Sequence, residues 1–227
     1  MIMGYTHTEA ENFITYIAPI IQREGFARGY RVVSTVIAQA IVEGACGKSG
    51  LAKNYHNHFG LKAGRAWIQA KKPAVNLKTK EEYTPGTLTT INDFFRVYVD
   101  DAAGVAGYYD FISTSRYANL KEAQDYRQYA EFLKKDGYAT SSTYVSNLCN
   151  KVVLYGLTKW DEETKYFPQY VGGGESIVNA LDELGIESSY SYRKKIYNAN
   201  FNGLYVGAAG QNTAILNLLK QGILIMP

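Results

Sequence analysis

The chain has 227 residues and a formal net charge of +3; 46% of its residues are hydrophobic and 20% are charged. These values are typical of a globular protein of one or two domains, and they exclude wholesale disorder and the broad basic face of a dedicated nucleic-acid binder. Two cysteines cannot hold so long a chain together by disulfides. The unusual feature is the 20 tyrosines, which suit either a surface that stacks on ring-shaped polar ligands or an aromatic core.

The start of the chain carries neither the basic region nor the apolar run of a signal peptide. No stretch approaches the roughly 18 to 20 apolar residues that span a bilayer. We therefore expect synthesis in a cytoplasm, with Cys46 and Cys149 reduced and with no membrane insertion.

The first part of the chain predicts helices that flank a β-hairpin. Thr8 is the expected N-cap of a helix over 9–24, and Ser34 that of a helix over 35–43. The second run is apolar nearly all round, so we expect it to be buried. Alternating residues around Pro85-Gly86 predict the hairpin over 74–98. Further helical patterns cover 101–112, 120–135 and 143–154.

A shift in composition near Trp160 divides the chain. Residues 160–174 have little apolar periodicity and include three successive glycines, so they predict a linker between a domain over 1–159 and a module over 175–227. The module shows helical patterns over 176–184, 191–200 and 211–221. The expected fold class is α+β, mainly α: a helical domain with a β-hairpin lobe, followed by a small three-helix C-terminal module.

Glu43 is the most informative carboxylate. It ends the apolar helix 35–43, where burial and the negative end of the helix dipole both raise the pKa of a carboxyl group. A carboxyl that stays protonated near neutral pH is what a general acid requires. Glycosidic cleavage needs such an acid, together with a second carboxylate or a substrate group on the other face of the sugar. The alternative is a solvated glutamate at a helix end.

Several segments occur in the order found in one enzyme family. They are Val33–Glu43 with Gly47–Ala52, Asn57–Lys62, Thr79–Tyr83, Phe95–Tyr98, Arg116–Ala118 and Gly137–Thr140. Together they cover roughly residues 10–155, and they resemble glycoside hydrolase family 73, the bacterial and phage N-acetylglucosaminidases of peptidoglycan. The resemblance implies a fold similar to goose-type lysozyme and an endo-β-N-acetylglucosaminidase activity that uses neither a cofactor nor a metal.

The same resemblance implies roles for individual residues. Glu43 is the general acid, and the second acidic residue is Glu81 or Glu82. Matching from Thr79 selects Glu81, whereas counting back from Phe95-Arg96 selects Glu82. Because side chains alternate along a strand, Glu81 shares the face of Thr79, and we favour it. The role of this second residue stays open, since the N-acetyl group of the substrate can act in its place.

Aromatic and polar residues of the later motifs are expected around the sugar. Tyr138 is the expected aromatic wall of the cleft, with a core position as the alternative. Asn57, Phe59 and Tyr117 lie in matching segments and are expected to contact the substrate. The chain departs from the family at residues 44–46, which are Gly-Ala-Cys where the family often has Ser-Gly-Trp.

Two rival chemistries have weaker signals. Cys46 with His56 or His58 would suit a cysteine peptidase, but no signature of such a family surrounds Cys46. His7 together with His56 and His58 would suit zinc, but no matching acidic motif accompanies them. No glycine-rich phosphate loop follows a predicted strand, so nucleotide binding is not supported.

The C-terminal module has its own resemblance. Its segments Ser176–Leu181, Ser188–Ile196 and Ala208–Lys220 resemble the cell-wall-binding module of clostridial and bacillar phage lysins. Arg193, Lys194 and Lys195 then either contact anionic wall polymers or form a solvated helix face.

The expected protein is a phage endolysin of a Gram-positive host. It would act on peptidoglycan after holin-type release from the cytoplasm. The alternatives are a cellular autolysin of the same chemistry and a catalytically inactive wall-binding or virion structural protein. The expected partners are peptidoglycan and anionic wall polymers, with no nucleic acid; the oligomeric state is not predicted.

Overall fold

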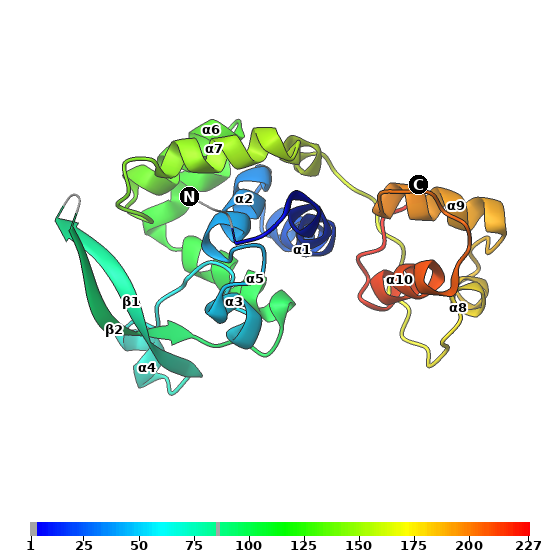
Figure 1. Ribbon diagram of the computed structural model, residues 1–227, viewed down its shortest axis with the longest axis horizontal. Coiled ribbons are helices and arrows are strands. Elements are labelled where there is room, and N and C mark those ends of the chain that lie inside the picture. Colours follow the sequence, from blue (N-terminus) through cyan, green and yellow to red (C-terminus); the bar gives the residue numbers. More distant parts are fainter. Residues whose placement is uncertain (1–3, 85–86) are drawn as a thin grey trace. The chain divides into compact units, whose positions relative to one another are not determined.

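The computed structural model describes residues 4–84 and 87–227, and the side chains of residues 80–89 lie outside that description. The chain forms two compact units, Met1–Glu162 and Glu163–Pro227. The first unit contains α1 (His7–Ala27), α2 (Ser34–Glu43), α3 (Gly50–Tyr55), α4 (Arg65–Gln69), β1 (Ala74–Thr84), β2 (Thr87–Arg96), α5 (Asp101–Ile112), η1 (Ser115–Glu122), α6 (Tyr126–Lys135), α7 (Tyr144–Leu154) and η2 (Leu157–Asp161) (Figure 1). The second contains α8 (Ile177–Glu183), α9 (Tyr190–Asn200) and α10 (Ala209–Lys220).

Helix α2 is the centre of the first unit. Its residues from Ser34 to Ile41 are all buried, and α1, α6, α7 and η2 pack around it. This confirms the buried helix that the apolar run predicted. Burial of so many apolar side chains supplies most of the driving force for folding this unit.

The caps of the first two helices differ from the expected ones. Helix α1 begins two residues earlier than predicted, because Thr6 rather than Thr8 is its N-cap and forms a reciprocal capping box with Glu9. Ser34 does not cap α2. Instead the carboxylate of Asp161 accepts hydrogen bonds from the backbone N–H groups of Val33 and Ser34, both at 2.7 Å, and from the Ser34 hydroxyl at 2.6 Å.

The predicted hairpin is confirmed as an antiparallel two-stranded sheet that projects from the helices of the first unit (Figure 1). Its register runs without interruption from Ala74 opposite Arg96 to Glu81 opposite Thr89, and a shift follows between Glu81 and Thr84. The segment before α4 joins the base of the sheet, since Ala63 N–H donates to the Phe94 carbonyl at 2.7 Å.

The expected linker over 160–174 is divided between the two units. Trp160 is buried in the first unit and Asp161 caps α2 there, so these residues are integral to that core. From Glu163 onward the chain belongs to the second unit, where Tyr166 pairs with Ile225 and the Phe167 N–H donates to the Leu224 carbonyl at 2.9 Å. Low apolar periodicity did not show these contacts, because they are made by single residues with distant partners.

The second unit is the predicted three-helix module. Ile177, Leu181, Ile196 and Leu219 from its helices are buried together with Phe167. Throughout the part of the chain that the structure describes, helices are too short or too polar to cross a membrane.

Candidate active site

A cleft of about 950 Å³ lies in the first unit, within the size range of ligand sites. Its walls are the end of α2, the start of α3, the segment 59–62, residues 77–79 of β1 and the segment 138–147. Segments far apart in the sequence therefore meet around one hollow, and most of them carry the motifs that identified the candidate residues.

Glu43 lies in this cleft at the last position of α2. Glu43 is exposed at the surface of the cleft, and the surrounding protein walls partly desolvate its carboxyl group. This desolvation raises the pKa of Glu43 to about 7. The carboxyl is therefore partly protonated at neutral pH, as a general acid must be.

The loop after Glu43 turns sharply. Ala45, Cys46 and Gly47 all have left-handed backbones, with φ values of +49°, +54° and +77°. Such a conformation is costly for residues other than glycine and persists only where the surroundings hold it. Backbone hydrogen bonds hold the loop, from the Cys46 N–H to the Ile41 carbonyl oxygen at 3.3 Å and from the Ser49 N–H to the Gly44 carbonyl oxygen at 3.0 Å. Gly44 also lies close to the His58 backbone, since a Cβ there would stand only 3.1 Å from the His58 carbonyl oxygen.

Tyr138 and Phe59 line the cleft together. The Tyr138 hydroxyl donates to the Phe59 carbonyl oxygen at 3.0 Å. The hydroxyl proton is therefore used within the protein, and Tyr138 offers its ring to the cleft rather than a free hydrogen-bond donor. This placement agrees with the expected aromatic wall.

The two later sequence motifs meet behind that ring. Arg116 donates hydrogen bonds to the carbonyl oxygens of Asp136 and Gly137, just before Tyr138. Gly137 has φ +74°. Tyr117 is buried, is not among the residues that line the cleft, and packs against Tyr138 with ring centroids 6.3 Å apart. The structure therefore places Tyr117 in support of the wall rather than against a sugar.

Asn57 also lies outside the cleft lining. It is 1% exposed, donates to the carbonyl oxygens of Leu61 and Arg96 and accepts from the Leu61 N–H, each at 2.9 Å. Its amide thus ties the segment 57–61 to the end of β2. Asn57, expected to contact the substrate, instead bonds to the backbone behind the cleft wall.

Leu77, Lys78 and Thr79 bring β1 to the edge of the cleft. The side chains of Glu81 and Glu82 lie outside the described residues, so the choice between them stays a prediction. The register is uninterrupted up to Glu81, but Lys78 and Thr79 both line the cleft, so the strand alternation alone does not decide between the two glutamates.

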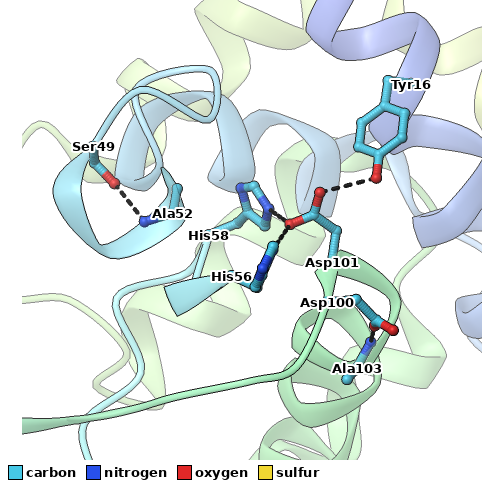
Figure 2. A network of polar contacts seen from close by, with 8 residues as sticks. All are labelled: Tyr16, Ser49, Ala52, His56, His58, Asp100, Asp101 and Ala103. Atoms are coloured by element: carbon cyan, nitrogen blue, oxygen red, sulfur yellow. Dashed lines mark hydrogen bonds and ion pairs between the residues drawn. The ribbon is translucent and has the colours of Figure 1, made fainter. Parts of the chain in front are cut away.

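A polar cluster joins α1, the segment after α3 and α5 (Figure 2). One oxygen of Asp101 accepts from His56 Nδ1 and His58 Nε2, both at 2.7 Å, and the other accepts from the Tyr16 hydroxyl at 2.9 Å. Burial alone would raise the pKa of Asp101, but the hydrogen bonds from both histidines outweigh it and lower that pKa to about 2. The sequence pattern did not pair these residues, because Asp101 is 43 positions from His58.

This cluster also bears on the rival chemistries. Both imidazoles are directed at one carboxylate oxygen, and the described His, Cys, Asp and Glu residues include no group arranged to hold a metal ion. Burial raises the pKa of the Cys46 thiol to about 11, so it carries almost no thiolate at neutral pH. The described residues therefore offer no activated cysteine nucleophile beside Glu43.

Tyr144 is a cleft residue that the sequence analysis missed. It lies at the start of α7 and is only 4% exposed. Its hydroxyl accepts from Gln39 Nε2 at 2.9 Å, and Gln39 Oε1 accepts from the Tyr108 hydroxyl at 2.5 Å. Gln39 precedes Glu43 by four residues, so both lie on the same face of α2. The sequence offered one signal of this contact: a glutamine within an apolar helix, one turn before the candidate acid.

In the second unit, α9 carries the three basic residues. Lys194 and Lys195 are exposed, whereas Arg193 is half-buried and its Nε has no hydrogen-bond partner among the described residues. Leu204 and Val206 are also exposed, at 73% and 60%.

The family described as "Glucosaminidase: Mannosyl-glycoprotein endo-beta-N-acetylglucosaminidase" matches residues 18–157, which include every wall of the cleft. The chain belongs to this family. The match confirms the family that the motifs indicated. The first unit is therefore a glycoside hydrolase domain, which we call the glucosaminidase domain.

Relatives and solved structures resemble this domain. Exo-glucosaminidase LytG of Bacillus subtilis is 32% identical over 140 residues, which are 59% of this chain and 48% of that protein. The catalytic domain of the autolysin Auto from Listeria monocytogenes has a TM-score of 0.56 at 25% identity, covering 69% of this chain and 90% of that one. A peptidoglycan hydrolase mutant from Sphingomonas sp. A1 has a TM-score of 0.57 at 26% identity, covering 66% and 97%.

The similar structures confirm the lysozyme-like, mainly helical fold class. The chain spans about half the length of its curated relative LytG. None of these similarities extends the family assignment to the second unit, which lies outside residues 18–157.

Proposed function

We propose that the protein is a peptidoglycan hydrolase that cleaves the β-1,4 bond after N-acetylglucosamine. The observation that carries this proposal is Glu43, whose desolvation in the cleft raises its pKa to about 7. The names of the relatives support the substrate class, since one is a glucosaminidase and another a peptidoglycan hydrolase.

Glu43 donates its proton to the glycosidic oxygen as the bond from that oxygen to the sugar C1 breaks. The positive charge that develops at C1 requires a partner on the opposite face. Glu81 of β1 is the proposed partner, either as a base that activates water or as an electrostatic stabiliser. The acetamido group of the substrate is the alternative. Water then adds to C1, and its proton is lost to the group that faces it.

Mass spectrometry of digested peptidoglycan tests the bond and the mode of attack. The products are reduced with borohydride, which marks the new reducing end. A reduced N-acetylglucosamine end supports the proposal, and a reduced N-acetylmuramic acid end contradicts it. Release of internal disaccharides indicates endo cleavage, whereas release of single N-acetylglucosamine residues indicates the exo mode that LytG carries in its name. Glu43→Gln is the matched control.

The second unit is the proposed wall-binding module. Lys194 and Lys195 are exposed on α9, and no carboxylate forms a salt bridge with them in the part of the chain that the structure describes. Anionic wall polymers are therefore their proposed partners. Lys194→Ala with Lys195→Ala should weaken sedimentation with purified Gram-positive walls and reduce its salt dependence. Unchanged binding would mean that these lysines form a solvated face.

We infer further that the protein acts as a phage endolysin of a Gram-positive host, made in the cytoplasm and released by a holin. The similarity of the second unit to phage-lysin modules supports this role. Similarity to a Listeria autolysin favours a cellular autolysin as the second candidate. Expression of the chain in a Gram-positive cell, with and without a holin, separates them. An endolysin lyses the cell only with the holin, whereas lysis without it supports the autolysin.

A further inference from the structure

Two tyrosines face the cleft beside Glu43, and their hydroxyl protons have different fates. The Tyr138 hydroxyl donates to the Phe59 carbonyl oxygen. The Tyr144 hydroxyl is an acceptor, because Gln39 Nε2 donates to it at 2.9 Å. No oxygen among the described residues accepts the proton of Tyr144. Tyr144 thus lines the cleft while nearly buried, and its hydroxyl proton has no acceptor among the described residues.

The orientation of this donor is fixed by a chain of hydrogen bonds. Tyr108 donates to Gln39 Oε1 at 2.5 Å, which directs the Gln39 Nε2 group at Tyr144. Gln39 and Tyr108 are both 0% exposed, so water does not compete for these bonds. The Tyr144 hydroxyl therefore keeps one lone pair occupied by the protein and offers its proton away from Gln39.

The phenol of Tyr144 also stays protonated. Burial, followed by the charge of nearby Glu43, raises its pKa well above the ordinary value. Glu43 likewise raises the pKa of Tyr138. Glu43, Tyr138 and Tyr144 all line the one cleft, and the carboxyl of Glu43 is close enough to both phenols to act on them electrostatically.

The neighbours of this donor define the group that it would bind. The rings of Tyr144 and Tyr138 lie nearly parallel, at 22° with centroids 6.3 Å apart. A hydrogen-bond donor therefore stands beside an apolar aromatic face. An acetamido group matches this pair, since its carbonyl oxygen is an acceptor and its methyl group packs on a ring.

We propose that Tyr144 is a specificity-determining residue that donates a hydrogen bond to the N-acetyl carbonyl oxygen of the sugar bound beside Glu43. Gln39 is its positioning residue. This inference rests on the proposed function, because it assumes an N-acetylated glycan in the cleft. It assigns the recognition of the N-acetyl group to α7 and leaves the proton transfer to Glu43.

Tyr144→Phe tests the donor because it keeps the ring and removes the hydroxyl. Turnover is measured on purified glycan strands and on the same strands after enzymatic de-N-acetylation. We expect kcat/KM on the N-acetylated strands to fall by roughly 3- to 10-fold, as for one lost neutral hydrogen bond, and kcat/KM on the de-N-acetylated strands to change little. An equal loss on both substrates, or no loss on either, would overturn the proposal.

Calorimetric binding of tetra-N-acetylchitotetraose, compared between the wild-type chain and Tyr144→Phe, separates this inference from the proposed function. A loss of affinity in Tyr144→Phe supports the hydrogen bond from Tyr144 even if peptidoglycan is not cleaved. Unchanged affinity overturns the proposal. Tyr30→Phe is the matched control, because its buried hydroxyl bonds to the Ile112 carbonyl away from the cleft. We expect it to leave affinity unchanged.

Gln39→Leu tests the positioning role. It should produce the same selective loss of kcat/KM on N-acetylated strands, and the double variant with Tyr144→Phe should lose no more than Tyr144→Phe alone. Additive losses would show that Gln39 does not act through Tyr144. Thermal unfolding of each variant verifies that the comparison is made on folded protein.

Discussion

Replacing Glu43 by glutamine removes the proposed proton donor while keeping the shape of the side chain. General acid catalysis contributes a factor of about 100 to 10,000, so turnover should fall by that amount. The pKa of about 7 adds a second, independent signature. Only the protonated form of Glu43 can act as an acid. About nine tenths of it is protonated at pH 6 and about one tenth at pH 8, so kcat/KM should fall roughly tenfold across this interval.

The assay follows the release of reducing ends from purified glycan at constant ionic strength between pH 5 and 9. The descending limb near pH 7 should be present in the wild-type chain and absent from the residual activity of Glu43→Gln. Glu122→Gln, an exposed carboxylate of η1 outside the cleft lining, is the matched control and should retain the wild-type profile. Near-wild-type turnover by folded Glu43→Gln, or activity that rises through pH 7, would refute the assignment.

The raised pKa of Glu43 also predicts a change in stability with a definite sign. Because folding favours the protonated carboxyl, its favourable contribution is complete below the unfolded pKa near 4.5 and is lost as the pH rises through about 7. Glu43→Gln should therefore gain stability relative to the wild-type chain above pH 7. Urea unfolding at pH 5 and pH 8 measures this difference, and an identical difference at both pH values would contradict the desolvation of Glu43.

The other predictions concern the polar cluster around Asp101, the hairpin and the two units. Asp101→Asn should lower the free energy of unfolding by about 2 to 3 kcal/mol at pH 7, because its pKa of about 2 lies well below the unfolded value; urea titrations should show about half of this difference lost by pH 3. Glu81→Gln should reduce glycan hydrolysis more than Glu82→Gln, and the reverse order would place Glu82 in the cleft. A fragment of residues 1–162 should fold by circular dichroism and cleave soluble glycan, since the whole cleft lies within it. The fragment 163–227 should sediment with walls without degrading them, and failure of the folded fragment to bind any Gram-positive wall would remove its targeting role.

Local patterns in the sequence were sufficient where neighbouring residues decide the structure. The apolar run before Glu43 predicted a buried helix, and α2 is buried from Ser34 to Ile41. Alternation around Pro85-Gly86 predicted the hairpin. The order of the motifs indicated the family, which the match over 18–157 confirms. Periodicity and motif order are properties of contiguous segments, so they can be detected without knowledge of the fold.

Only the tertiary structure decided which distant residues act together. Asp161, at the end of the domain in sequence, caps α2, and Asp101 accepts hydrogen bonds from three residues of two distant segments. The Asn57 amide bonds to backbone groups, whereas Tyr144 lines the cleft and its hydroxyl bonds to the buried Gln39. A buried polar atom takes whichever partner the fold brings within about 3 Å, and the sequence distance between partners has no bearing on that choice. The amino-acid sequence thus determined the helices, the hairpin and the candidate acid, and packing determined the hydrogen-bond partners that shape the site around it.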